Sequence, residues 1–263
     1  MIDLHNHILP GIDDGATDIN EALEMARIAV EEGFSGIVAT PHFGSGQFSS
    51  DVNEVRKRVL ELNDKLASVD VNLTIYPGME ARLTADVLNS LSNGTVISLN
   101  DSQYILLELP PLQVPAGFEN FVRMMINSGR KIVLAHPEKN VELQTYPDTI
   151  YKLVTMFRPG DLLVQITADS ITGDAGLRAL STSKWLLENG LAHILATDAH
   201  SPIHRAPRMR NALELVSSLV GREKTIKMTT DWPRNIIQNE DVVCSHPRKK
   251  PEKRKRFFGL FGK

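Results

Sequence analysis

The sequence of 263 residues is poor in cysteine, and its one cysteine, Cys244, cannot form a disulfide within the chain. A disulfide framework is therefore excluded, and this composition is typical of a reducing compartment. The thiol chemistry of cysteine phosphatases is excluded as well, because these enzymes need an arginine six residues after the cysteine. That position is Lys250, in a basic segment with no predicted strand before it.

Long hydrophobic runs are also absent from the sequence. No stretch of about 18 apolar residues occurs, so no transmembrane helix is predicted. The opening residues MIDLHNHI have neither a basic region nor an apolar core, which argues against a secretory signal and predicts a cytoplasmic protein. No glycine-rich loop opens a helix in the pattern that binds nucleotide phosphates.

The charges are unevenly distributed along the chain. Residues 248–263 hold eight basic residues and one acidic residue (+7), whereas residues 1–247 hold 21 basic and 31 acidic residues (−10). Apolar residues make up 42% of the chain and charged residues 23%, as in ordinary globular proteins. The sequence predicts one globular domain, residues 1–240, followed by a basic, phenylalanine-rich and flexible tail, residues 241–263.

Short apolar runs alternate with amphipathic helical patterns through most of the chain. The predicted strands are 2–8, 36–40, 71–76, 104–109, 131–135, 162–167 and 193–197. The predicted helices are 19–32, 51–68, 83–91, 118–129, 147–157, 174–189 and 206–220. Strict alternation of this kind implies an α/β protein with parallel strands and helices packed outside them. About seven such units without a dinucleotide-binding turn favour a (β/α) barrel over an open sheet.

Polar residues that can bind metals follow the apolar strands at their C-terminal ends. In a parallel barrel this end is the functional face. His5 and His7 are two residues apart on one strand, so both side chains project to the same side. The full predicted ligand set is His5, His7, Asp14, His42, Glu80, Glu108, His136, Asp198 and His200. Each residue alone is a weak signal, but the whole set in register with the strand ends is a strong one.

Imidazole and carboxylate ligands together suit zinc, manganese or iron. Nine ligands are too many for one four-coordinate ion and predict two or three ions with a bridging carboxylate. Such a site lowers the pKa of a bound water and neutralises charge on a phosphoryl oxygen. The other three histidines, His193, His204 and His246, are not expected to bind metal, because they lie at a strand start, in a loop and in the tail.

A phosphate substrate would also need fixed cations. Arg205 follows the Asp198-Ala199-His200 turn and can form a bidentate fork, and Lys139 follows His136 by three residues. The predicted catalytic residues are Arg205, Lys139, Asp198 and His200, the last two also as metal ligands.

These motifs resemble those of the polymerase and histidinol phosphatase (PHP) superfamily, and more closely its bacterial protein-tyrosine phosphatase branch. The resemblance covers roughly residues 1 to 240. It rests on the opening Asp3-Leu4-His5-Asn6-His7-Ile8-Leu9-Pro10-Gly11-Ile12-Asp13-Asp14-Gly15, and on Pro41-His42, Pro77-Gly78-Met79-Glu80, Leu107-Glu108, His136-Pro137-Glu138 and Thr197-Asp198-Ala199-His200.

The resemblance implies a distorted seven-stranded (β/α) barrel of the PHP type and a three-metal site that usually holds Mn²⁺. It also implies dephosphorylation of tyrosine on bacterial tyrosine kinases that control capsule or exopolysaccharide assembly. The nine ligands carry over, and Arg205 carries over as a phosphate-binding arginine. Where relatives have arginine after His-Pro-Glu, this chain has Lys139, which keeps the charge but loses the bidentate fork.

Two other functions fit parts of the sequence. A small-molecule phosphomonoesterase of the histidinol-phosphate type would have a closed, lidded pocket, whereas a protein substrate needs a wide, shallow one. A non-catalytic metal-binding docking protein is disfavoured, because the ligand set is intact. The tail, residues 248–263, combines basic residues with Phe257, Phe258 and Phe261. It is either a disordered, solvated segment or one that docks on a partner or on the inner face of a membrane, and peripheral membrane contact is the hypothesis. Nucleic acid is not expected as a partner, because the body is acidic.

Overall fold

The computed structural model describes residues 1–263 except 46–47, 85–86 and 248–263, so the predicted membrane-contacting part of the tail lies outside the described residues. The strands are β1 (Ile2–Asn6), β2 (Gly36–Ala39), β3 (His42–Ser45), β4 (Phe48–Ser49), β5 (Thr74–Pro77), β6 (Glu80–Arg82), β7 (Tyr104–Glu108), β8 (Lys131–Ala135), β9 (Leu162–Thr167) and β10 (Ile194–Ala196). The helices are α1 (Ile19–Glu32), α2 (Val52–Ser68), α3 (Val87–Ser92), α4 (Phe118–Asn127), α5 (Val141–Thr145), α6 (Asp148–Met156), α7 (Ala168–Thr172), α8 (Leu177–Glu188), α9 (Arg210–Val220), α10 (Arg222–Ile226) and α11 (Trp232–Ile237).

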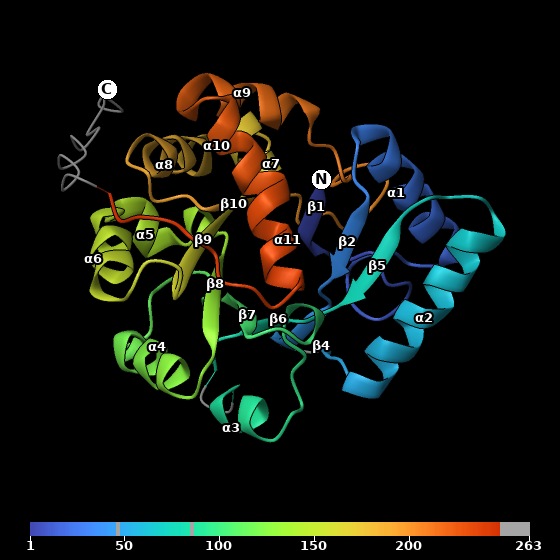
Figure 1. The fold of residues 1–263 in the computed structure, drawn as a ribbon, viewed down its shortest axis with the longest axis horizontal. Helices are drawn as coiled ribbons and strands as arrows, with labels where there is room; N and C mark the ends of the chain where they lie inside the picture. Colours follow the sequence, from blue (N-terminus) through green and yellow to red (C-terminus); the bar gives the residue numbers. More distant parts are fainter. Residues whose placement is uncertain (46–47, 85–86, 248–263) are drawn as a thin grey trace, which may run out of the picture.

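The strands lie in the middle of the molecule with helices around them (Figure 1). They form two sheets, one in the order β1-β2-β5 and one in the order β10-β9-β8-β7-β6-β3-β4. Every pairing is parallel except the β3–β4 hairpin. The predicted α/β class with parallel strands is therefore confirmed.

The predicted count of seven strands is wrong, because the described residues form ten. Interruptions at the ends of the predicted strands 36–40 and 71–76 are followed by the short strands β3 and β6, and β4 pairs with β3. Between β2 and β3 the chain passes through Thr40 and Pro41, and Pro41 has no N–H to give to a ladder. Between β5 and β6 it passes through Gly78 and Met79. A Cβ on Gly78 would lie 2.8 Å from Cγ1 of Val38, so only glycine lets the two chain segments approach this closely.

The first and last strands come together across the two sheets. Asn6 forms an isolated parallel bridge with Ala199, the His7 N–H donates to the Ala199 carbonyl at 2.9 Å, and the Asp198 N–H donates to the His5 carbonyl at 2.9 Å. The C-terminal end of β1 therefore lies beside the C-terminal end of β10.

Side-chain caps and a glycine mark the ends of the first two helices. The Asp18 side chain accepts from the N–H groups of Asn20 and Glu21 at the start of α1, and Gly33 ends the helix with φ 95°. Asp51 caps α2 in the same way. The predicted helix 206–220 begins only at Arg210, and the helical segment from Arg222 to Ile237, which ends in α11, was not predicted.

The core is formed by the strands and the inner faces of the helices, with Leu4, Leu106 and Ile194 fully buried. The chain packs on this core beyond residue 240, because the Val242 N–H donates to the Tyr104 hydroxyl at 2.9 Å. Among the described residues no helix has the length and apolar character needed to cross a membrane.

Candidate metal centre

The C-terminal ends of the strands bring the predicted ligands into one cluster. His5 lies on β1 and is fully buried, and His7 follows it by two residues at 1% exposure. Two predicted ligands begin strands rather than end them, since His42 opens β3 and Glu80 opens β6. They still reach the cluster because each strand starts immediately after one of the two interruptions.

The deepest part of the cluster joins β1 to β6 and to the turn after β10. Nε2 of His5 lies 3.2 Å from Nε2 of His7 and 3.3 Å from Oδ1 of Asp198. Nε2 of His7 lies 3.5 Å from Oε2 of Glu80. Because the Nε2 atoms of both rings and both carboxylates point at the same place, a shared cation fits this arrangement better than any hydrogen-bond scheme.

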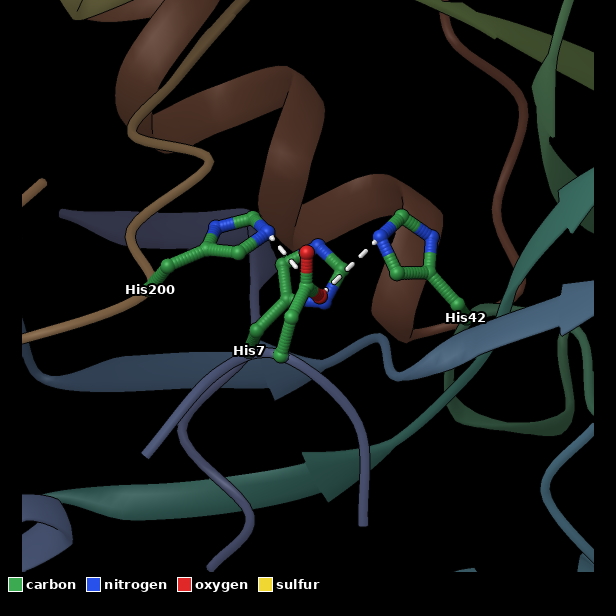
Figure 2. Close-up of side chains that lie close together, drawn as sticks. His7, His42 and His200 are labelled. Carbon is green, nitrogen blue, oxygen red and sulfur yellow. Dashed lines mark ion pairs between the residues drawn. The ribbon is translucent and has the colours of Figure 1, made fainter. Parts of the chain in front are cut away.

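A second part of the cluster lies toward solvent. His7, His42 and His200 turn their rings toward one another in Figure 2, and the His7 and His200 ring centroids are 3.8 Å apart. Oδ1 of Asp14 lies 3.3 Å from Nε2 of His42 and 3.5 Å from Nε2 of His200. Asp14 is the most exposed member, with half of its side chain open to solvent, so this part of the site is accessible from outside.

A third part of the cluster contains His136 and Glu108, and Glu80 links it to the other two parts. Oε1 of Glu80 accepts from Nε2 of His136 at 2.8 Å, and Glu80 forms a further group of ligand atoms with His42 and Glu108. Four overlapping groups of ligand atoms result, and together they contain all nine predicted residues: His7, Asp14, His42 and His200; His5, His7 and Glu80; His5, His136 and Asp198; His42, Glu80 and Glu108.

Buried polar atoms left without a partner show that the residues fit a metal. Oε2 of Glu80 and Nδ1 of His42 are 2.9 Å apart, yet among the described residues neither makes a hydrogen bond. Leaving buried polar atoms unpaired costs roughly 1–3 kcal/mol each. A divalent cation held by nitrogen and carboxylate ligands would satisfy both atoms.

Charge is strongly coupled within the cluster. Burial lowers the pKa of His7, but Asp13 and Asp198 outweigh burial and bring it to about 9. Burial raises the pKa of Glu80, but His5, His136 and His42 hold it well below its usual range. His200 differs, because burial and the positive charge of His7 lower its pKa to about 3. The Glu80 carboxylate thus stays ionised, as a carboxylate ligand of a metal must.

Two residues that orient the ligands were not predicted from the sequence. Oδ2 of Asp13 lies 2.7 Å from Nδ1 of His7, and Oε1 of Gln165 lies 3.1 Å from Nδ1 of His5. Each contact fixes the ring so that Nε2 points into the cluster. Asp13 had a signal in the sequence, since it sits beside Asp14, whereas Gln165 lies inside an apolar strand and had none.

Backbone geometry marks the site as well. His136 has φ 28° and Asp198 has φ 54°, a conformation that costs non-glycine residues of order 1–3 kcal/mol. The loop after β1 is held tightly, because a Cβ on Gly15 would lie 2.0 Å from the carbonyl oxygen of His7. This close packing brings Asp13 and Asp14 back onto the end of β1.

The two predicted phosphate-binding cations lie beside the cluster. Arg205 Nη2 lies 2.7 Å from Oδ2 of Asp198, and Lys139 Nζ lies 3.0 Å from the same oxygen and 3.0 Å from Oδ2 of Asp169. Both residues line a hollow of about 290 Å³ that also reaches the ligands His42, His136 and His200. Arg82, which was not predicted, lines this hollow too and holds Glu108 through Nε at 2.6 Å and Nη2 at 3.0 Å.

The three remaining histidines lie outside the cluster. His193 is buried before β10, and its Nδ1 accepts from the Val164 N–H at 3.1 Å. His204 is exposed, and His246 lines a separate hollow near the C-terminal end of the described chain. Neither His193, His204 nor His246 belongs to any of the ligand groups found among the described residues.

Comparisons with known proteins agree with this arrangement. The family model "Capsular polysaccharide synthesis, CpsB/CapC" matches residues 1–238. The chain is 36% identical over 261 residues to "Tyrosine-protein phosphatase YwqE" of Bacillus subtilis (strain 168), an alignment that covers 99% of this chain and all of the relative. It is 26% identical to "Tyrosine-protein phosphatase CpsB" of Streptococcus pneumoniae, over 91% of this chain and 99% of the relative.

A solved structure is similar over nearly the whole chain. It is described as "Crystal structures of YwqE from Bacillus subtilis and CpsB from Streptococcus pneumoniae, unique metal-dependent tyrosine phosphatases". Its TM-score is 0.90 at 35% identity, and the match covers 97% of this chain and 100% of that one. The predicted resemblance to bacterial metal-dependent tyrosine phosphatases is thereby confirmed. The chain belongs to the CpsB/CapC family of capsular polysaccharide synthesis.

Proposed function

We propose that this chain is a metal-dependent protein-tyrosine phosphatase that hydrolyses phosphotyrosine on a bacterial tyrosine kinase of capsule or exopolysaccharide assembly. The observation that carries the proposal is the convergence of nine nitrogen and carboxylate ligands beside a hollow lined by Lys139 and Arg205. The similarity to YwqE, named a tyrosine-protein phosphatase, supports phosphotyrosine as the substrate.

His5, His7, Asp14, His42, Glu80, Glu108, His136, Asp198 and His200 would hold two or three divalent cations, with Mn²⁺ as the proposed metal and iron or zinc as alternatives. When bound, such cations activate a water molecule and neutralise charge on phosphoryl oxygens. Glu80 contacts histidines in every part of the cluster, so it is the proposed bridging carboxylate. Asp13 and Gln165 keep the rings of His7 and His5 aimed at the cations.

Arg205 and Lys139 would bind the phosphoryl group. Both now contact Asp198, and the Arg205 side chain is 41% exposed, so its guanidinium can meet an incoming phosphate at the rim. Arginine offers two parallel donors to the phosphate oxygens. Lys139 offers a single point charge, and Asp169 and Asp198 fix its position from two sides.

The exposure of the site supports a protein substrate over a small molecule. Asp14 and Arg205 are about half open to solvent, and both face the hollow. A phosphotyrosine on the surface of another protein can reach such an open site, whereas a phosphatase of the histidinol-phosphate type would enclose its substrate in a closed pocket. The intact set of ligands and phosphate-facing cations speaks against a non-catalytic docking protein.

The organisation of the chain is also part of the proposal. The two sheets would act as one distorted barrel, because β2 continues into β3, β5 continues into β6, and Asn6 bridges to Ala199. Residues 1–240 would form the catalytic domain, with residues 241–244 packed on it.

Residues 248–263 would contact anionic lipid at the cytoplasmic face of the membrane, beside the kinase. Deleting residues 248–263 should then abolish sedimentation with anionic liposomes, and unchanged sedimentation would contradict the membrane contact.

The function is tested by hydrolysis of a tyrosine-phosphorylated peptide and of histidinol phosphate by metal-stripped protein, with and without Mn²⁺. Mn²⁺-dependent release of phosphate from the peptide is expected, with loss of activity in His136→Ala. His246→Ala is the matched control, because His246 lies outside every ligand group. Activity on histidinol phosphate alone would replace the proposal with a small-molecule phosphatase.

A further inference from the structure

A second hollow adjoins the candidate active site. It has a volume of about 290 Å³, and its lining includes Arg205, Arg208, Ile203 and Asp169. Arg205 lines both hollows, so the second one adjoins the place where Arg205 would meet a phosphate. An extended chain advances about 3.3–3.6 Å per residue, so the neighbours of a phosphotyrosine would lie within reach.

The loop between the two hollows is fixed relative to the metal ligands. The N–H groups of His200 and Ser201 both donate to the Arg205 carbonyl, at 2.8 and 3.2 Å. The Ser201 hydroxyl oxygen accepts from the His204 N–H at 3.1 Å. Because these bonds tie residues 200–205 into one turn, the second hollow keeps a constant position beside the ligand His200.

Three carboxylates line this hollow, matched in number by Arg205, Arg208 and Arg210, and each carboxylate accepts a hydrogen bond within the fold. Oε2 of Glu32 accepts from the N–H groups of Met209 and Arg210, at 3.0 and 2.8 Å. Asp169 holds Lys139, and Oδ2 of Asp174 accepts from the Thr172 hydroxyl at 2.6 Å.

Among the basic groups, Arg208 stands apart. Arg205 contacts Asp198, and Arg210 donates to the Glu31 carbonyl at 2.9 Å. Within the described part of the chain, the exposed Arg208 side chain has no hydrogen bond or ion pair. The hollow therefore presents one unpaired guanidinium next to the apolar side chain of Ile203, which is 75% exposed.

We propose that Arg208 and this hollow form a recognition subsite for an acidic residue close to the phosphotyrosine on the substrate chain. The inference rests on the proposed phosphatase function and adds a specificity-determining residue to it. A guanidinium pairs well with a carboxylate, and Ile203 gives the substrate backbone an apolar surface to pack on. Selection by this subsite would act on binding and not on the chemical step, since Arg208 lies beyond Arg205 from the ligands.

The test compares pairs of phosphotyrosyl peptides, and the two peptides of a pair differ only by Glu or Gln at one position. Separate pairs place this residue at each of the two positions on either side of the phosphotyrosine. For the wild-type protein with Mn²⁺, kcat/KM should favour a Glu peptide by roughly three- to fivefold at low salt, the range of an exposed ion pair. The preference should disappear in Arg208→Gln and weaken in high salt, because salt screens exposed charges. Arg222→Gln is the matched control and should keep the preference, since Arg222 is exposed at the start of α10 and does not line the hollow.

Each outcome separates the inference from the function. Hydrolysis of both peptides without a preference for Glu would overturn the subsite and leave the phosphatase function intact. A preference that survives in Arg208→Gln would also overturn it. Hydrolysis of neither peptide by the wild-type protein would overturn the phosphotyrosine function, and the subsite with it.

Discussion

Buried histidines lie near both ends of strand β10, in different surroundings. His193 precedes the strand at 2% exposure, and His200 follows it at 6% exposure. Burial lowers the pKa of each to about 3, helped by the charge of Lys224 at His193 and of His7 at His200. His193 has a protein partner in the Val164 N–H and packs near Trp232, whereas His200 faces other imidazoles and carboxylates. Burial of a histidine therefore says little about metal binding, and convergence of several ligands on one place says much more.

The largest effect on activity is expected from Glu80→Gln, in the cluster of metal ligands that also contains His200. Glu80 contacts His5, His7, His42 and His136, and an amide of the same shape removes the charge that they share. Several kcal/mol of charge stabilisation would be lost, so kcat/KM on a phosphotyrosyl peptide should fall by about 10³-fold or more. Elemental analysis should show fewer ions bound per chain. Glu240→Gln, exposed in the coil that follows α11, is the control, and equal activity of the two variants would contradict a metal-binding role for Glu80.

A smaller effect is expected from Asp13→Asn, which leaves every ligand in place. The Asp13 carboxylate fixes Nδ1 of His7 at 2.7 Å and also accepts from the His42 N–H at 3.1 Å. Weakening this support should reduce Mn²⁺ affinity by roughly 10- to 100-fold, measured by calorimetric titration of metal-stripped protein. Asp18→Asn provides the comparison, because asparagine caps α1 as well as aspartate does. An unchanged Mn²⁺ affinity in Asp13→Asn would show that the ring needs no such support.

The smallest effect on activity is expected at the other end of β10, from His193→Leu. This change leaves the Val164 N–H unpaired and should lower the free energy of unfolding by about 1–3 kcal/mol. The folded pKa of His193, about 3, lies below the ordinary 6.5, so its contribution is fully present above pH 6.5 and is lost as the pH falls from 6.5 toward 3. Urea unfolding at pH 7.5 and pH 5 should show a weaker pH dependence in the variant than in the wild type. An identical pH dependence would mean that His193 is not held neutral.

The sequence was sufficient to predict which side chains gather in the cluster, because the C-terminal ends of parallel strands lie at one edge of a sheet. The alternation of apolar strands with helices indicated where that edge lies, and the histidines and carboxylates there indicated a metal site. The sequence was not sufficient where a side-chain contact joins residues that are far apart in the chain. Nothing local distinguishes Gln165 from a neighbouring apolar position, and only the folded strand order places it against His5.

The interruptions of the strands were harder to predict for a different reason. Short strands such as β6 carry too few residues to show a period, and the break at Gly78 depends on the approach of Val38 from another strand. Arg82 was missed because it lies just past this break, where no helix or strand pattern indicated that it would face Glu108.

The bridge between Asn6 and Ala199 has a consequence for how the protein is made. His5 and Asp198 are almost 200 residues apart in the chain, yet their side chains lie 3.3 Å from each other. Chain segments with such distant partners come together late in folding, because a long loop must close first. A chain that stops anywhere before residue 198 would carry most of the ligands and still lack a complete site. Because the first and last strands to be synthesised both contribute to the site, a complete cluster can form only after all the described strands have been made.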